Sequence, residues 1–312
     1  MIKKLFIVLT ILLYGTPVFS AFKDGNNWNA RASGIGGSYI SIADDASAPS
    51  YNPAGIAQAR DYQFFFNYSK PYTGVELVNL NYTCLSLLVP VEGAGVFGIG
   101  WNDFIASSLY EEYSILLSFG MSMDRIFSSK ARNIFAGISV KYLYHGFQLD
   151  IRSTDDPVFL SGKGNGNIGI DFGLIARGVI SGLPGLNLGI AGKNLNEPDV
   201  GLSEKDPVRR QIGLGLSYRI EGNDKNKAEF LPSLDLTYRD ETFNLGGGLE
   251  TVLLNKLLII RAGANFQEVT LGLGTIYRIR NLFEFNFNYA FLLPLNIEGS
   301  YGSHQVSLAI RL

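Results

Sequence analysis

From about residue 62 to the C-terminus, apolar and polar side chains alternate with a period of two. In the last such segment, one face carries His304, Val306, Leu308, Ile310 and Leu312, and the other carries Gln305, Ser307, Ala309 and Arg311. Successive side chains of a β-strand point to opposite faces. The pattern therefore predicts strands that each have one apolar face and one face of polar or small residues.

Roughly fourteen such segments follow one another, each about the 9–11 residues that a tilted strand needs to cross a bilayer. The predicted strands lie near 62–68, 77–89, 94–105, 110–122, 133–145, 166–177, 186–193, 210–220, 229–239, 243–252, 257–266, 269–279, 283–292 and 304–312. Since boundaries drawn from pattern alone are imprecise, we expect between about 12 and 16 strands. This is an all-β chain.

Two folds would show this alternation. A soluble β-sandwich turns its apolar faces inward, whereas a transmembrane barrel turns them outward to lipid and closes on itself, because backbone groups in lipid must be paired. The number of strands, the glycine-rich polar faces and the aromatic residues near strand ends favour the barrel. Those aromatic residues include Tyr142, Tyr144, Tyr218 and Tyr238.

The connections and the composition agree with a barrel. Tight turns near 90–93, 253–256 and 280–281 alternate with longer polar segments near 146–165, 195–209 and 293–302, as in outer-membrane barrels. Charged residues make up 17% of the chain, against about 25% in globular domains. The net charge of −2 gives no electrostatic support for a nucleic-acid partner.

The first twenty residues have the order of a secretory signal peptide. Lys3 and Lys4 precede a short apolar run, and Val18 and Ser20 stand at the −3 and −1 positions of a cleavage site before Ala21. The apolar run is too short to span a membrane, which needs about 20 residues. We therefore expect residues 1–20 to be removed; a retained anchor helix is the alternative.

Residues 21–60 form a separate region before the barrel of residues 61–312. They are small, polar and rich in glycine, without sustained alternation, and we expect short helical turns such as Ile35–Ala43. A segment of this size can fill a barrel's lumen, since some barrels are plugged by a loop or a helix. The alternative is a periplasmic tail.

This region also carries the most specific motif of the chain. It runs through Ala30-Arg31-Ala32-Ser33-Gly34-Ile35-Gly36-Gly37-Ser38-Tyr39-Ile40, then Ala43-Asp44-Asp45, then Tyr51-Asn52-Pro53-Ala54-Gly55-Ile56-Ala57. The order and spacing resemble the start of the PorV/PorQ proteins within the FadL-like outer-membrane barrels. The resemblance covers most of the mature chain as architecture, but only about thirty residues as motif, a small share of such a barrel.

FadL-like barrels carry long-chain fatty acids and other hydrophobic molecules across the outer membrane, and an N-terminal hatch blocks their lumen. The resemblance therefore implies a hatch element at Asn52, Pro53, Ala54 and Gly55. Pro53 fixes its own φ and favours an extended Asn52, and glycine at 55 is compatible with backbone conformations closed to other residues. An ordinary Asn-Pro turn is the alternative interpretation.

A kink in the third strand opens a lateral exit in FadL-like barrels. In this chain Gly98, Gly100 and Asn102 weaken the third predicted strand, and glycine within a strand often marks a bend. We expect a strand kink there as a hypothesis, while glycine-rich strands without a kink are also common in barrels.

Three functions are compatible with the sequence. The first is a passive channel for hydrophobic small molecules; the second is a PorV-like component of type IX secretion that binds or shuttles secreted proteins. The third, a hydrolase at the barrel rim, has only His145 and His304 to build on, and we expect no enzyme.

We expect no metal or cofactor, because no His/Cys cluster exists and Cys84 is the one cysteine. The expected location is the bacterial outer membrane, in contact with its lipid.

Overall fold

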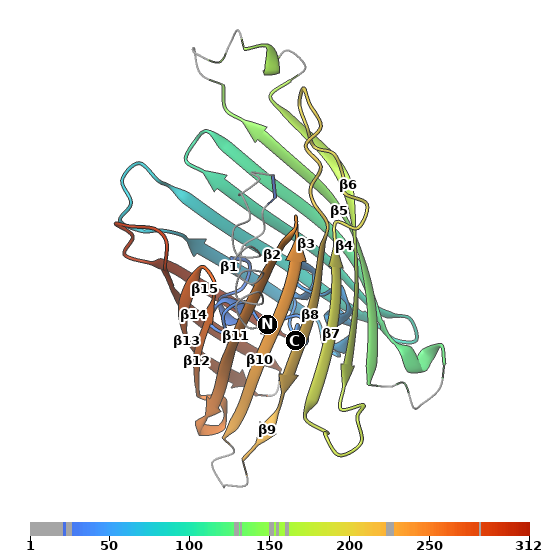
Figure 1. Cartoon of the computed structure of the whole chain (residues 1–312). Coiled ribbons are helices and arrows are strands. Elements are labelled where there is room, and N and C mark those ends of the chain that lie inside the picture. Colours follow the sequence, from blue (N-terminus) through green and yellow to red (C-terminus); the bar gives the residue numbers. More distant parts are fainter. Residues whose placement is uncertain are drawn as a thin grey trace, which may run out of the picture.

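The protein is a closed antiparallel β-barrel in the computed structural model of the chain (Figure 1). The structure describes residues 21–312 except 23–26, 128–130, 132, 150–152, 154–155, 160–161, 223–227 and 281. The predicted signal peptide, residues 1–20, lies outside the described residues.

Each strand pairs with its sequence neighbours, and β1 pairs with β15 to close the barrel. The strands of the first half are β1 (Gln63–Lys70), β2 (Leu80–Val91), β3 (Gly95–Ala106), β4 (Tyr110–Ser122), β5 (Ile134–Phe147), β6 (Gly164–Arg177) and β7 (Leu186–Lys193). Those of the second half are β8 (Gln211–Tyr218), β9 (Ile220–Glu221), β10 (Glu229–Arg239), β11 (Thr242–Leu253), β12 (Leu258–Asn265), β13 (Glu268–Ile279), β14 (Phe283–Pro294) and β15 (Ser303–Arg311).

Fourteen strands form the barrel among the described residues when β8 and β9 are taken as one, since both pair with β10 and only Arg219 separates them. The predicted number of strands is confirmed. The boundaries of β4, β7 and β10 coincide with the predicted ones.

The apolar faces point outward. Large apolar side chains such as Ile99, Leu117 and Leu271 are about half exposed, while small and polar residues of the same strands are buried inside. A soluble sandwich would bury the apolar faces instead, so this alternative is wrong. A broad apolar exterior is what lipid contact requires of a transmembrane barrel.

The two ends of the barrel differ. One end, the loop end, carries the longer connections 71–79, 148–163, 194–210 and 295–302. The other, the turn end, carries the start of β1 and the end of β15 and is connected mostly by short segments, although 123–133 is longer. In outer-membrane barrels the short turns are periplasmic and the long loops extracellular.

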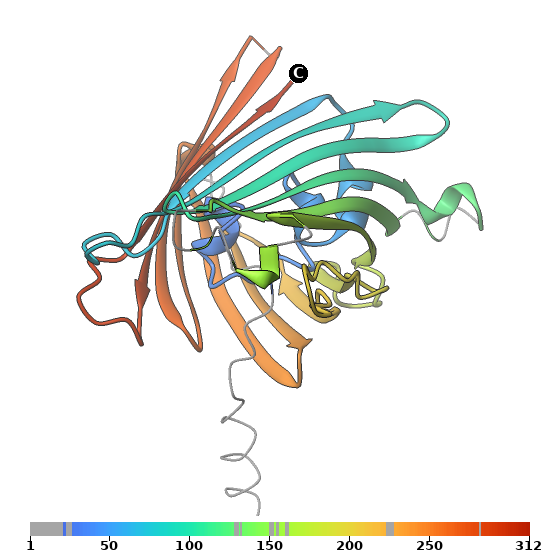
Figure 2. The same ribbon diagram turned by 90° about the horizontal axis from the view of Figure 1, so that it is seen from above.

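The N-terminal segment, residues 27–59, lies inside the ring of strands (Figure 2). Its helical parts are α2 (Ala30–Ser33), η1 (Ala48–Ser50) and η2 (Pro53–Gln58); the short helical turns elsewhere are η3 (Met123–Arg125), η5 (Pro157–Phe159) and η6 (Leu254–Lys256). The predicted helical turn Ile35–Ala43 is reduced to a single hydrogen-bonded turn, in which the N–H of Ala43 donates to the carbonyl oxygen of Tyr39 at 2.9 Å. Gly36 and Gly37 have φ of 67° and 83°, and this left-handed backbone stops a helix from continuing.

Candidate functional site: a segment docked in the lumen

The inner wall of the barrel is lined by glycine where the N-terminal segment touches it. A Cβ added to Gly173 of β6 would lie 1.8 Å from Oδ1 of Asn52, and one added to Gly137 of β5 would lie 2.3 Å from the backbone of Pro53. Since no real Cβ comes so close to another atom, any other residue would push the segment away. The glycine-rich inward faces therefore form the surface on which the segment docks.

Asn52 joins the segment to this wall through its side-chain amide. Its Nδ2 lies 2.9 Å from the carbonyl oxygen of Ile40 within the segment and 3.2 Å from those of Leu174 and Ile190 in β6 and β7. Its Oδ1 accepts from the N–H of Ala54 at 3.1 Å and so begins η2, with Pro53 at the first helical position. The amide thus fixes a turn and binds the wall at once.

The predicted element of residues 52–55 is brought together and fully buried at the start of η2. The reason for glycine at 55 differs from the one we expected, because its φ is not positive. A Cβ at Gly55 would instead lie 2.0 Å from the carbonyl oxygen of Ala43. Close approach within the segment, and not an unusual backbone angle, requires glycine there.

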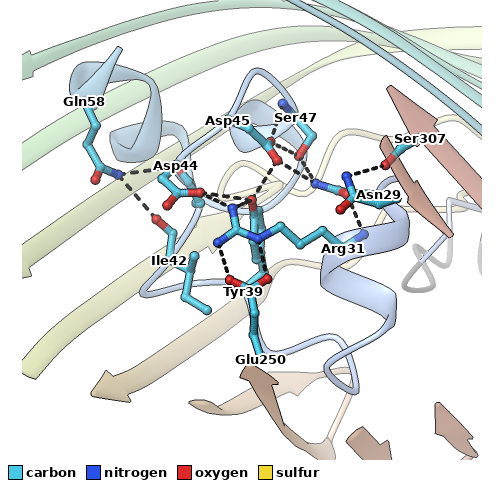
Figure 3. A network of polar contacts seen from close by, with 12 residues as sticks. Asn29, Arg31, Tyr39, Ile42, Asp44, Asp45, Ser47, Gln58, Glu250 and Ser307 are labelled. Atoms are coloured by element: carbon cyan, nitrogen blue, oxygen red, sulfur yellow. Dashed lines mark hydrogen bonds and ion pairs between the residues drawn. The ribbon is translucent and has the colours of Figure 1, made fainter. Parts of the chain in front are cut away.

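A second attachment is a buried cluster of charges that the sequence did not reveal (Figure 3). Arg31 of α2 contacts Asp44 at 2.5 Å and binds both carboxylate oxygens of Glu250 in β11, at 2.8 and 2.9 Å. Arg261 of β12 contacts the same Glu250 at 2.7 Å. Two arginines and two carboxylates therefore balance in charge between the segment and the wall.

Neutral and acidic groups continue this network around Tyr39 (Figure 3). The Tyr39 hydroxyl donates to Asp45 at 2.8 Å, and the Asn29 amide donates to Asp45 at 3.1 Å and to Ser47 at 2.7 Å. On the wall side, Asp235 of β10 accepts from the backbone N–H of Tyr39, at 2.7 Å. The polar side chains of the motif are thus used to hold the segment in one shape.

The charges of the segment stabilise one another. Burial alone would raise the pKa of Asp44, but the nearby guanidinium of Arg31 holds it well below its usual range. Burial would likewise lower the pKa of Arg31, yet the carboxylates of Asp44 and Glu250 raise it. The pKa of Tyr39 is raised by burial and by the charge of Asp45. Arg31 and Asp44 therefore both stay charged at neutral pH.

On the loop-end side of the segment lies a small chamber with a cavity volume of about 20 Å³. Its lining combines apolar side chains with a buried ion pair between Lys141 and Asp171, 2.8 Å apart. The apolar part includes Phe22, Trp28 and Leu143. A volume of this size holds about one water molecule.

The β7–β8 connection, residues 194–210, folds inward over this chamber. Val200 and Val208 are fully buried against Phe22 and Leu143. The carbonyl oxygen of Val200 lies 2.7 Å from Nε2 of His145. Within this loop, hydrogen bonds from the backbone N–H groups of Gly201 and Asp206 lower the pKa of Asp199. The loop end is thus covered by an ordered loop.

The residues of the expected kink, Gly98, Gly100 and Asn102, all face the lumen. The Asn102 amide donates to the Ser50 hydroxyl at 2.9 Å, and a Cβ on Gly98 would lie 3.8 Å from Ile56. β3 pairs with β2 and β4 without a gap through these positions. The wall is continuous there in this conformation, and the kink stays a prediction.

The two histidines lie on opposite faces of the wall. His145 is buried in the lumen, whereas His304 faces outward with its Nδ1 2.7 Å from the Tyr289 hydroxyl. They do not share a site. No group of three or more His, Cys, Asp or Glu residues suited to a metal occurs among the described residues. Over the same part of the chain, no helix is long and apolar enough to cross a membrane.

Comparison with protein-family models and with curated proteins found no match. Among solved structures, the chain is similar to the Ralstonia pickettii toluene transporter TbuX, with a TM-score of 0.57 and 12% identity over 92% of this chain and 97% of that one. It is also similar to the Pseudomonas putida toluene transporter TodX (TM-score 0.54, 12% identity, 95% and 99% coverage). A Pseudomonas aeruginosa FadL homologue gives a TM-score of 0.54 at 12% identity, with 96% and 99% coverage.

At this level of identity the likeness concerns the fold, and it spans nearly the whole of each chain. It agrees with the closed fourteen-stranded sheet and the lipid-facing apolar exterior. The chain is an outer-membrane β-barrel with the fold of the FadL-like channels.

Proposed function

We propose that the protein is a passive channel for hydrophobic small molecules across the outer membrane. The observation that carries the proposal is the N-terminal segment docked inside a barrel whose fold is shared with two toluene transporters. An open porin would leave a water-filled lumen, which suits polar solutes. Here the docked segment fills the lumen, which suits a molecule that enters only when the segment moves.

The docked segment would act as the hatch. Its attachments include buried charges at Arg31 and, at residues 52–55, close packing on the glycine-lined wall together with the neutral hydrogen bonds of the Asn52 amide. Breaking the charged attachment is costly, because a buried charge without its partner is strongly unfavourable. Uncharged contacts cost less to break, so we expect the region of η2 to leave the wall while α2 stays attached.

An apolar groove on the outer surface of the barrel supports a lateral exit near β3. An apolar groove of about 510 Å³ lies on the lipid-facing side, lined by residues such as Leu87, Phe97, Ile99 and Leu117. Gly98 separates this groove from Ile56 of the hatch on the inner side. Because one strand alone stands between the two, a local rearrangement of β3 would connect the lumen with the membrane.

A disulfide that locks the hatch tests the proposal. The hydroxyls of Ser41 in the segment and Ser217 in β8 lie 3.0 Å apart, so Ser41→Cys with Ser217→Cys, in a Cys84→Ala background, replaces a hydrogen bond by a bond of similar reach. We expect proteoliposomes with the oxidised variant to take up labelled toluene no faster than empty vesicles. Reduction should restore uptake.

A matched control uses two serines of the wall alone. Ser118 of β4 and Ser139 of β5 are paired neighbours with hydroxyls 2.6 Å apart. The corresponding double-cysteine variant joins two strands that already pair, and its uptake should not respond to oxidation. If the wild-type protein takes up neither labelled toluene nor labelled palmitate above empty vesicles, the channel proposal fails.

The alternative is a PorV-like component of type IX secretion that binds secreted proteins. The motif of residues 30–57, with its Gly-Gly, Asp-Asp and Asn-Pro-Ala-Gly elements, supports this second proposal. Affinity purification from the native membrane tests it: secreted cargo or secretion components should co-purify. A genome without type IX secretion genes would count decisively against it.

A further inference from the structure

The two ends of the barrel differ in charge. In the sequences that connect strands at the turn end, basic residues outnumber acidic ones by seven to three. In the connections of the loop end, eleven acidic residues stand against five basic ones. The turn end therefore carries an excess of positive charge, and such a surface attracts anionic partners.

Three basic side chains of the turn end are exposed at the tips of its connections: Arg125, Lys256 and Arg280. None of them forms an ion pair with a carboxylate of the residues that the structure describes. Lys256 and Arg280 have φ of 74° and 45°, in the left-handed region where glycine is the usual residue. The chain thus keeps long basic side chains where the backbone favours glycine, which indicates that these side chains have a use of their own.

Large apolar side chains lie next to these basic ones. Between 54% and 71% of each is exposed, and they are Ile126, Phe127, Leu254, Leu257 and Leu282. On the strands beside Arg280, Ile279 and Phe283 are each 40% exposed, so the apolar exterior of the barrel reaches the turn end. The apolar side chains of the connections continue this lipid-facing surface, and contact with lipid removes them from water.

We propose that the turn end binds anionic phospholipids of the periplasmic leaflet. Their acyl chains cover the apolar side chains, and their phosphates lie beside Arg125, Lys256 and Arg280. Such binding grows with the apolar area that is buried and with the attraction of basic side chains to anionic headgroups. An acidic protein matches the positive charge alone, whereas a lipid matches both the charge and the adjoining apolar surface. The proposal concerns the outside of the barrel and does not depend on the channel function.

Quenching of tryptophan fluorescence by brominated lipids tests the proposal. The chain has two tryptophans; Trp101→Phe leaves Trp28, which is buried in the lumen at 7% exposure, and Leu257→Trp adds a reporter at the turn end. Liposomes of phosphatidylcholine contain the same fraction of either brominated phosphatidylglycerol or brominated phosphatidylcholine. We expect the anionic lipid to quench the reporter roughly threefold more strongly, and this preference to fall away at high salt, because salt screens the attraction.

The loop end provides the control. Both leaflets of these liposomes have the same composition, so the orientation of the barrel does not matter, and Leu295→Trp reports on the loop end in the same membranes. We expect no preference for the anionic lipid there. An equal preference at both ends would overturn the proposal. The variant Lys163→Gln with Lys205→Gln and Arg210→Gln removes three positive charges from the loop end and should leave the preference at the turn end unchanged.

The matching variant of the turn end, Arg125→Gln with Lys256→Gln and Arg280→Gln, should abolish the preference of the turn-end reporter for the anionic lipid. An unchanged preference in this variant would overturn the proposal. So would a reporter that neither lipid quenches, because water or a protein, and not lipid, would then surround the turn end. If the protein with Leu257→Trp does not fold, Leu282→Trp places the reporter in the next connection of the same end.

Discussion

Removing the charge of Glu250 should release α2 from the barrel wall without opening the barrel. Glu250 lies between Arg31 and Arg261 and accepts from both, and all three side chains are less than a tenth exposed. In Glu250→Gln, Arg31 keeps Asp44, but Arg261 loses the carboxylate that it contacts at 2.7 Å. A buried guanidinium would then stand without a counter-charge.

The size of the effect follows from the burial. Breaking a buried ion pair by removing one partner costs about 3–5 kcal/mol, because the other charge stays buried and uncompensated. The strands keep their pairing, so the loss falls on the docking of the segment. At about 1.4 kcal/mol per factor of ten, hydrogen exchange in residues 27–59 should become roughly a hundredfold to several thousandfold faster.

Hydrogen exchange with mass spectrometry of the detergent-solubilised protein measures this directly. Peptides from β1 to β15 serve as the internal reference. A combined variant, Arg31→Met with Asp44→Leu, Glu250→Met and Arg261→Met, removes all four charges of the cluster and should restore much of the protection, since apolar groups of similar size can replace buried ions. If Glu250→Gln leaves the exchange of the segment unchanged, the cluster does not hold it.

The glycine-lined wall gives a second test: Gly173→Ala would place a carbon 1.8 Å from Oδ1 of Asn52 and should expose the segment to protease, whereas Gly100→Ala, with nothing nearer than 3.6 Å, should be tolerated. The pKa of Asp44 is depressed, so its ion pair is fully present above the unfolded pKa of about 3.9 and is lost only as the pH falls towards the folded pKa. The difference in segment exchange between the wild type and Asp44→Asn should thus be equal at pH 7 and pH 5, and a smaller difference at pH 5 would contradict the pairing. Finally, the folded barrel should migrate faster on a gel when unheated than when boiled; a single band under both conditions would contradict the transmembrane fold.

The strands could be predicted almost residue by residue because lipid and lumen impose opposite demands on neighbouring positions. The segments 110–122, 186–193 and 229–239 coincide with β4, β7 and β10. The prediction is weaker near the ends of strands, where lipid and lumen no longer constrain each position. The predicted strand 210–220 is split at Arg219 into β8 and β9. A period of two says nothing about such a local break.

The charged attachments of the segment could not be predicted, because they depend on which inward positions of the wall come to face the segment. Arg31 stood within the motif, but its partners Glu250 and Arg261 are more than 200 positions away in β11 and β12. On those strands both residues lie at inward-facing polar positions. The sequence alone does not show which of the carboxylates and guanidiniums at such positions will meet. Only the register of β11 against β12, which pairs Glu250 with Arg261, places them side by side.

Glycine on the inward faces shows most clearly where sequence reasoning ends. We expected Gly98 and Gly100 to mark a kink, because glycine weakens a strand. In the structure Gly98, Gly137 and Gly173 share the inward phase and lie against the segment, where a side chain would collide with it or reduce the room for it. Space for the docked segment thus accounts for Gly137 and Gly173, while flexibility of the wall at Gly98 stays a prediction. The alanine variants separate the two: a substitution that only stiffens β3 would impair uptake while the segment stays protected, whereas one that fills its seat would expose the segment first.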